Sequence, residues 1–501
     1  MVTRIKGRER NPFFQGDLMV QIFEKIEGWN SKIHPKVKSI LTLLLFTWFV
    51  LSSLFSHALF GKWDFREILV NSSLVVLIIG SLYLRKEHFS KDFFFTPPMV
   101  VVIFIGLCFL INGLVFSVRG YLALALQCLF VFPYYWMGIS TNKDQVIFSL
   151  SWGFIFSYLI VLCMMFFLGP EFTLFQNSGL FGNPNLMGYY LTTVSSSILY
   201  SICRNQERAE NAKGFRQKMR ILNLFLLGSV VFITFCTTSR TSIICVLGEM
   251  ILTILFILRE KWEDCKKKQK GPSKFFVQVI KDLSLALAVM GFSALMIYLL
   301  FIYVKPRFEQ MVFGGSSTFY EDYLYDPSAA MEDELDSSLR YYTKGLGDRD
   351  LLNFTSGRIE IWKIFIRHLR FLGHKTETLF ITFSTRHNRS HGAHNIFIQL
   401  AYSIGLPAGI VYFLSILSSD LYYLGRLLFP GKKGKIKAEE MLILMAGSVL
   451  ALNAMTSSGY LFGRYLVPSH FLLISGPDQK KEGPGWIKKL IEKRRKKEDP
   501  S

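Results

Sequence analysis

Two arginines and one histidine could do chemistry here, because each lies in or beside a polar segment of an otherwise apolar chain. Arg240 follows Ser239 directly before an apolar run, Arg358 lies in a long polar stretch, and His394-Asn395 precede another apolar run. The planar guanidinium group presents forked donors that suit phosphate oxygens better than an ammonium group does. A histidine, with a pKa near ambient pH, suits removal of a proton from a hydroxyl group.

Long apolar runs must position these residues, and they predict an all-α polytopic membrane protein. The chain of 501 residues is 51% hydrophobic and only 19% charged. Because a bilayer core of about 30 Å requires roughly 20 apolar residues per crossing helix, runs near that length predict transmembrane spans. Twelve such runs occur, at 40–59, 68–84, 98–118, 121–139, 146–168, 186–203, 221–236, 242–258, 283–304, 396–418, 441–457 and 460–475.

Basic residues predict the orientation of these spans. The leader 1–39 and the tail 476–501 are rich in lysine and arginine, and so is every second loop: 85–97, 204–220, 259–282 and 425–440. By the positive-inside rule, both termini are cytoplasmic, which an even number of spans permits. The leader has no small-residue cleavage site before the first run, so we expect it to lie, partly amphipathic, at the inner surface. The net charge of +20 then faces anionic lipids, and no nucleic-acid partner is predicted.

The chain is thus expected to divide into a leader, nine spans over 40–304, a partly helical extracytoplasmic loop over 305–393, three spans over 394–475, and a tail. Four polar features share the outer face in this topology: 179–185, 237–240, the long loop, and His394-Asn395 where that loop re-enters the membrane. Their convergence is the strongest internal indication of a functional site.

The basic second half of the loop predicts one amphipathic helix, over 357–372. Its expected apolar stripe follows helical spacing and consists of Ile359, Trp362, Phe365, Ile366 and Leu369. The helix would either lie on the outer membrane interface or pack on the rest of the loop.

Four short motifs carry a family resemblance. Residues 182–185 read GNPN, 239–240 read SR, and 356–362 contain a Gly-Arg pair followed by Trp. His394-Asn395 are followed by nine residues and then Gly405. In this order, the motifs resemble those of the bacterial O-antigen ligase and O-antigen polymerase superfamily, over roughly 175–420. The family usually has a second glycine three residues after the first, where this chain has Ala408 followed by Gly409.

The resemblance implies a membrane glycosyltransferase of C-type fold in the cytoplasmic membrane, with its active site on the extracytoplasmic side. Its donor would be a glycan on undecaprenyl pyrophosphate, and its acceptor a hydroxyl group of a glycan or lipid. It implies no cofactor, no nucleotide sugar and no catalytic metal. The expected partners are membrane lipids, with a flippase and a chain-length regulator of the same pathway.

The resemblance also suggests roles for single residues. It makes His394 the candidate base and Arg358 and Arg240 the candidates that stabilise the departing pyrophosphate. Further substrate-binding candidates are Asn183, Asn185, Asn395 and, from this sequence alone, Arg386 and Arg389. Each has a structural alternative: a snorkelling or surface arginine, a helix-capping histidine, or an Asn-Pro turn.

The sequence is compatible with several functions. Polymerisation of surface-polysaccharide repeat units is preferred, and ligation to a lipid core or to protein would share its chemistry. A polysaccharide transporter or flippase is the alternative from another class, and a membrane receptor or scaffold is a third reading. A transporter would be expected to show an internal repeat and charges near the midplane. The sequence has no evident repeat, and most predicted spans lack a central charge.

Overall fold

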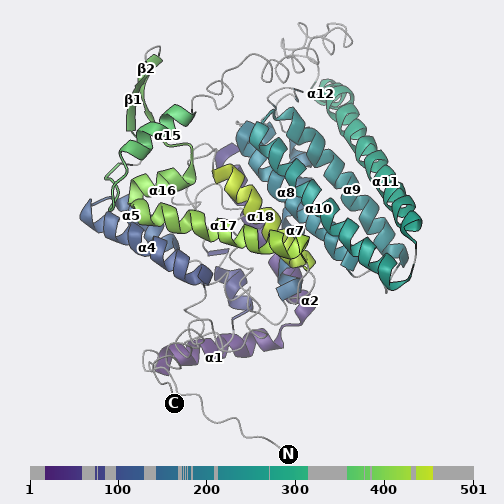
Figure 1. Cartoon of the computed structure of the whole chain (residues 1–501), viewed down its shortest axis with the longest axis horizontal. Coiled ribbons are helices and arrows are strands. Elements are labelled where there is room, and N and C mark those ends of the chain that lie inside the picture. Colours follow the sequence, from purple (N-terminus) through teal and green to yellow (C-terminus); the bar gives the residue numbers. More distant parts are fainter. Residues whose placement is uncertain are drawn as a thin grey trace, which may run out of the picture.

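The computed structural model describes most of the helical part of the chain (Figure 1). The described residues are 17–58, 74–75, 77–84, 97–128, 143–167, 172, 174, 177, 179–181, 184–207, 213–269, 271–313, 358–376, 379–383, 386–429 and 436–454. The predicted twelfth span, the basic tail and residues 314–357 of the predicted loop lie outside them.

Helices account for nearly all of the described part. They are α1 Asp17–Lys32, α2 Pro35–Ala58, α4 Pro97–Val115, α5 Arg119–Cys128, α7 Lys143–Phe167, α8 Pro184–Glu207, α9 Lys213–Cys236, α10 Arg240–Lys267, α11 Pro272–Leu299, α12 Lys305–Phe313, α15 Arg358–Arg367, α16 Ile396–Ile404, α17 Leu406–Leu428 and α18 Ala438–Ala454. A 3₁₀ turn, Gly179–Phe181, precedes α8, and a π-helical turn, Leu300–Val304, joins α11 to α12.

Six helical segments within the described residues are long and apolar enough to cross a membrane: Pro35–Ser52, Asp144–Phe167, Gln217–Cys236, Arg240–Lys267, Pro272–Met311 and Leu406–Leu428. A shorter apolar helix spans Val100–Val115. The chain is therefore a helical membrane protein, and the prediction of twelve spans remains a prediction.

Several helices differ from the predicted boundaries. α8 and α9 extend into the predicted loop 204–220, and α10 continues to Lys267 through the basic segment after 258. The π-helical turn carries the helix past 304 to Phe313, into the predicted loop. The predicted span 396–418 covers two helices, because Gly405, with a φ of 113°, separates α16 from α17.

A two-stranded antiparallel hairpin differs from the all-α prediction. Its strands are β1 Leu379–Phe383 and β2 Arg386–His391, with Leu379 opposite His391 and an irregularity between Ile381 and Phe383. The apolar, aromatic and β-branched composition of β1 favours a strand.

α8 lies at the centre of the bundle, where it packs against α7, α9, α10 and α18. Its middle is polar, yet its residues from Tyr190 to Cys203 are all buried. The hydroxyl group of Thr192 donates to the carbonyl oxygen of Tyr189 over 2.7 Å, and Ser197 donates to that of Thr193 over 3.0 Å. Bonds of this kind satisfy some of the hydroxyl groups inside the helix, which lowers the cost of placing a helix of low hydropathy in the interior.

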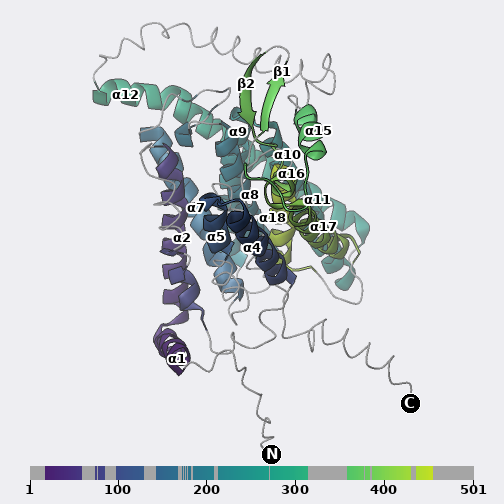
Figure 2. The same ribbon diagram turned by 90° about the vertical axis from the view of Figure 1, so that its left-hand side faces the viewer.

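The bundle has two distinct ends. α12, α15 and the hairpin lie at one of them, which we call the loop end, and α1 lies across the opposite one, the leader end (Figures 1 and 2). α1 is tied to the bundle because the side-chain amide of Asn30 donates to the carbonyl oxygen of Ser81. The described parts of the predicted loop and of the leader thus lie at opposite ends of the bundle.

Candidate functional site

His394 has an unusual backbone conformation at the start of α16. Its φ is 48°, in the left-handed region that non-glycine residues seldom adopt. Such a conformation costs on the order of 1–3 kcal/mol and persists only where its surroundings impose it. The side chain of His394 is half-buried, so that part of it remains accessible.

Two side chains of α16 hold the residues on either side of His394. Asn395 is the N-cap, and its Oδ1 accepts a hydrogen bond from the Ile398 amide over 3.1 Å. Oε1 of Gln399 accepts from the Ala393 amide over 2.8 Å, while its Nε2 donates to Ser403 Oγ over 3.1 Å. The strained backbone of His394 is therefore clamped from both sides by the helix that it precedes.

The predicted amphipathic helix exists as α15, but it is shorter than expected and packs on α16. Ile361 and Phe365 are buried in a cluster with Ala393 and Tyr402, and the centroids of the Phe365 and Tyr402 rings lie 4.8 Å apart. Ile366, placed on the apolar stripe by the spacing, is instead 53% exposed. This packing brings α15 against the residue directly before His394.

Arg358 begins α15, one turn before Ile361, and its side chain is half-buried. Burial lowers the pKa of its guanidinium group, and the nearby hydroxyl group of Tyr189 on α8 acts in the opposite direction. Tyr189 lies one turn into α8, which begins at Pro184 and Asn185. Arg358 therefore connects the loop to the end of α8 that carries the Asn-Pro-Asn motif.

The start of α10 is pressed against the same end of α8. A Cβ atom on Gly188 would lie 2.3 Å from Ser242 Oγ and 3.0 Å from Ser239 Cβ, so only glycine permits this approach. Thr238 has a φ of 54°, and its turn is closed by the Ser239 amide, which donates to Thr237 Oγ1 over 3.2 Å. Arg240 follows as the first residue of α10.

The predicted residues therefore fall into three groups. His394, Arg358, Arg240 and Asn185 belong to elements that adjoin one another: α15 packs on α16, Arg358 interacts electrostatically with Tyr189 of α8, and the start of α10 packs on α8. Asn395 lies there too; the residue is 5% exposed, and its side chain caps α16. Asn183 lies outside the described residues, and for Arg386 and Arg389 only the backbone position on β2 is described.

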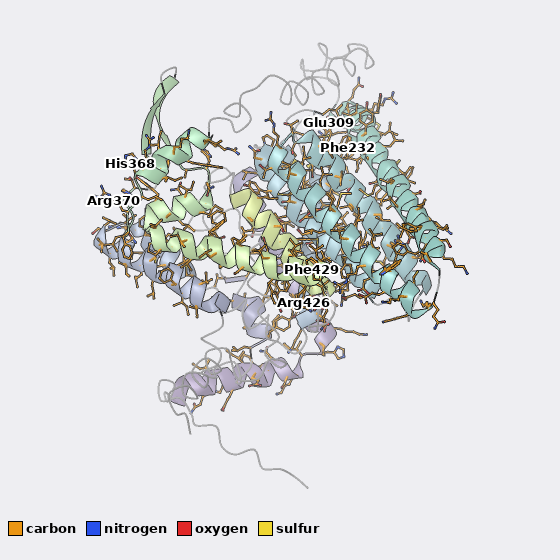
Figure 3. All side chains as sticks on the ribbon, in the orientation of Figure 1. Phe232, Glu309, His368, Arg370, Arg426 and Phe429 are labelled. Carbon is orange, nitrogen blue, oxygen red and sulfur yellow. The ribbon has the colours of Figure 1, made fainter. Side chains whose placement is uncertain are left out.

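Sequence reasoning missed the residues that support His394. His374 stacks on Tyr402 with ring centroids 4.1 Å apart, and its amide donates to the Ser403 carbonyl oxygen over 3.1 Å. Burial lowers the pKa of His374, with smaller effects from His368 and Arg370, whose side chains Figure 3 places beside α15 and α16. Gln399 did have a signal, because it is a lone amide in an apolar run.

The glycine motif after His394 now has a physical explanation. A Cβ atom on Gly405 would lie 2.2 Å from the carbonyl oxygen of Phe371. Ala408, three residues after Gly405, is fully buried. Gly409 provides the close approach of α17 to α16, since a Cβ there would lie 2.6 Å from the Ala401 Cβ atom.

Neither a metal centre nor a relative identifies the site. Within the described ranges, no group of three or more His, Cys, Asp or Glu side chains is placed to hold a metal ion. No protein-family model matches this sequence, and no curated protein sequence matches it either.

Proposed function

We propose that this protein transfers a glycan from undecaprenyl pyrophosphate to an acceptor hydroxyl group and so polymerises surface-polysaccharide repeat units. The observation that carries the proposal is the strained, doubly clamped backbone of His394 beside the helix that begins at Arg358. Strain of this kind is common at catalytic residues. A ligase for a lipid core or a protein would use the same residues and differ only in its acceptor.

In the proposed reaction, His394 accepts the proton of the acceptor hydroxyl as its oxygen attacks the anomeric carbon. The bond from that carbon to the pyrophosphate oxygen breaks, and the electron pair leaves with the lipid pyrophosphate. Arg358 and Arg240 stabilise the developing charge. Partial burial of Arg358 strengthens its electrostatic effect, because the local dielectric is lower than in water. Direct attack would invert the anomeric configuration.

The proposed orientation places the loop end outside the cytoplasmic membrane and both chain termini inside. Support comes from the basic leader and inter-span segments, which follow the positive-inside rule. Support also comes from α1 and α15, which lie at opposite ends of the bundle. An extracytoplasmic site has no access to nucleotide sugars, so a lipid-linked, already activated donor suits it.

The test uses purified full-length protein with a lipid-pyrophosphate-linked oligosaccharide and excess chelator. Release of undecaprenyl pyrophosphate and growth of the glycan on a gel are followed for the wild type, His394→Ala and Arg358→Ala. The matched controls are His368→Ala and Arg367→Ala, because both side chains are exposed on the same loop.

We expect a product ladder from the wild type and both controls, and none from the two site variants. Single-step transfer without a ladder would favour the ligase. Activity of His394→Ala equal to that of His368→Ala would overturn the assignment of the base. No lipid release from any donor would overturn the transferase itself.

A further inference from the structure

A buried carboxyl group lies deep inside the bundle, away from the site above. Glu249 is 1% exposed and belongs to α10, within a segment apolar enough to cross a membrane. It follows Arg240 by nine residues, which places it about 14 Å further along the helix. An ionisable residue at such a depth is costly and is more often functional than structural.

Among the described residues, the neighbours of Glu249 offer hydroxyl groups and no cationic side chain. Ser196 of α8 donates from its Oγ to Oε1 of Glu249, and the Ser195 hydroxyl group lies beside the same carboxyl group. Neither Oε2 of Glu249 nor Oγ of Ser195 makes a hydrogen bond of ordinary geometry within the described part of the chain. Within the described residues, Oε1 thus has the Ser196 donor, and Oε2 has no donor of ordinary geometry.

No opposite charge is available on the helices that pack against α10. These helices are α8, α9, α11 and α18. Their segments 184–203, 221–236, 283–299 and 441–454 contain no Asp, Glu, Lys, Arg or His. The titratable neighbour of Glu249 on its own helix is the Cys245 thiol, one turn earlier. The charged side chains of the four neighbouring helices lie beyond those segments, toward the leader end.

We propose that Glu249 is a proton-binding site in the membrane interior. A proton from water bonds to Oε2 and converts the carboxylate into a neutral carboxylic acid, whose Oε1 remains the acceptor of the Ser196 hydroxyl group. An unpaired carboxylate at this depth would lose its hydration without gaining a counter-charge, and such groups neutralise instead.

A proton fits this site better than a metal cation does. Sodium requires several oxygen ligands and room between them, whereas the described contacts supply one carboxyl group and two serine hydroxyl groups. The site lies on the seam between α8 and α10, whose loop end is the close contact of Gly188 with Ser242. Glycan transfer from an activated donor needs no such site, so this proposal stands independently of the proposed reaction.

Infrared spectroscopy of the full-length protein in lipid nanodiscs tests it, because a protonated carboxyl group has its own C=O stretching band. The wild type is compared with Glu249→Gln, which keeps the shape of the side chain but cannot bind the proton. Asp420→Asn is the matched control, since Asp420 is another largely buried carboxyl group, on α17 against Gly447 of α18. Ser196→Ala is a second variant, which removes the donor to Oε1.

Other carboxyl groups with a raised pKa, Glu439 among them, are also protonated at neutral pH and contribute C=O bands of their own. Among these bands, we expect one that Glu249→Gln removes and Asp420→Asn retains. It should shift on deuteration and disappear in strong alkali. In Ser196→Ala it should persist at higher frequency, because the C=O group has lost its hydrogen bond. An unchanged band in Glu249→Gln would overturn the proposal. Loss of the band on replacing potassium with sodium at constant pH would also overturn it, in favour of a sodium site.

Discussion

The backbones of Gly373 and Gly405 are in direct contact: a Cβ atom on Gly373 would lie 2.8 Å from the Gly405 amide nitrogen. Both glycines have positive φ angles, 80° and 113°. Beside this contact, the Leu406 amide donates to the Arg370 carbonyl oxygen over 3.0 Å. This crossing of the two backbones at Gly373 and Gly405 fixes the chain after α15 against the break between α16 and α17. It thereby relates the helix that begins at Arg358 to the helix that follows His394.

Gly405→Ala is expected to destabilise the fold and abolish transfer. The new methyl group would lie 2.2 Å from the Phe371 carbonyl oxygen, at a φ of 113°. Backbone strain and overpacking together cost on the order of 3 kcal/mol. Thermal unfolding in detergent measures the loss. Gly425→Ala within α17 is the control, because no heavy atom lies within 4 Å of its added carbon. Equal stability of the two variants would contradict the crossing.

Gly188→Ala should separate the starts of α8 and α10 and so lower the transfer rate. The added carbon would lie 2.3 Å from Ser242 Oγ, and overpacking of this kind costs about 1–3 kcal/mol. The double variant with Ser242→Gly should recover part of the activity, because it removes the nearest atoms. Gly248→Ala, where nothing lies within 4 Å, should behave like the wild type. A Gly188→Ala protein with the activity of Gly248→Ala would refute this contact.

Gln399→Leu should leave the Ala393 amide without its acceptor and release the backbone of His394. An unsatisfied buried amide costs about 1–3 kcal/mol. We expect kcat to fall while KM for the donor changes little, because Arg358 and Arg240 are untouched. Gln399→Glu keeps an acceptor oxygen for Ala393 and should retain more activity than Gln399→Leu. If folded Gln399→Leu keeps the full kcat, Gln399 does not position His394.

The leader end should lose stability as the pH rises. Burial, together with a hydrogen bond to Asp144, raises the pKa of Glu439 to about 8 from an ordinary value of 4.5. A carboxyl group with a raised folded-state pKa stabilises the fold fully below its unfolded pKa and loses that contribution as the pH rises through its folded pKa. The pH range over which this contribution to stability is lost therefore lies between 4.5 and about 8.

Glu439→Gln should remove this dependence and raise the melting temperature on the alkaline side only. After allowance for partial exposure, the effect is on the order of 1 kcal/mol. Thermal unfolding on both sides of this pH range measures it, and Glu24→Gln on the exposed face of α1 is the control. A wild-type melting temperature that is flat across the range would rule out the assignment.

The positions of helices were more predictable than their ends. Hydropathy changes abruptly where a helix leaves the apolar region, but its backbone hydrogen bonds can continue into a charged segment, as in α10 up to Lys267. Amphipathic spacing correctly predicted the existence of α15 and the burial of Phe365, but it misplaced Ile366. The face that a short helix buries depends on its partner, here α16, which spacing alone does not identify.

The sequence by itself determined that this is a helical membrane protein, because long apolar runs leave the backbone no other way to satisfy its hydrogen bonds in lipid. It also singled out His394, Arg358 and Arg240, through motifs that remain a resemblance. Only the tertiary structure decided the left-handed backbone of His394, the break at Gly405 and the buried Glu249. Each depends on a contact that periodicity does not encode: Gln399 with Ala393, Gly405 with Phe371, and Glu249 with Ser196.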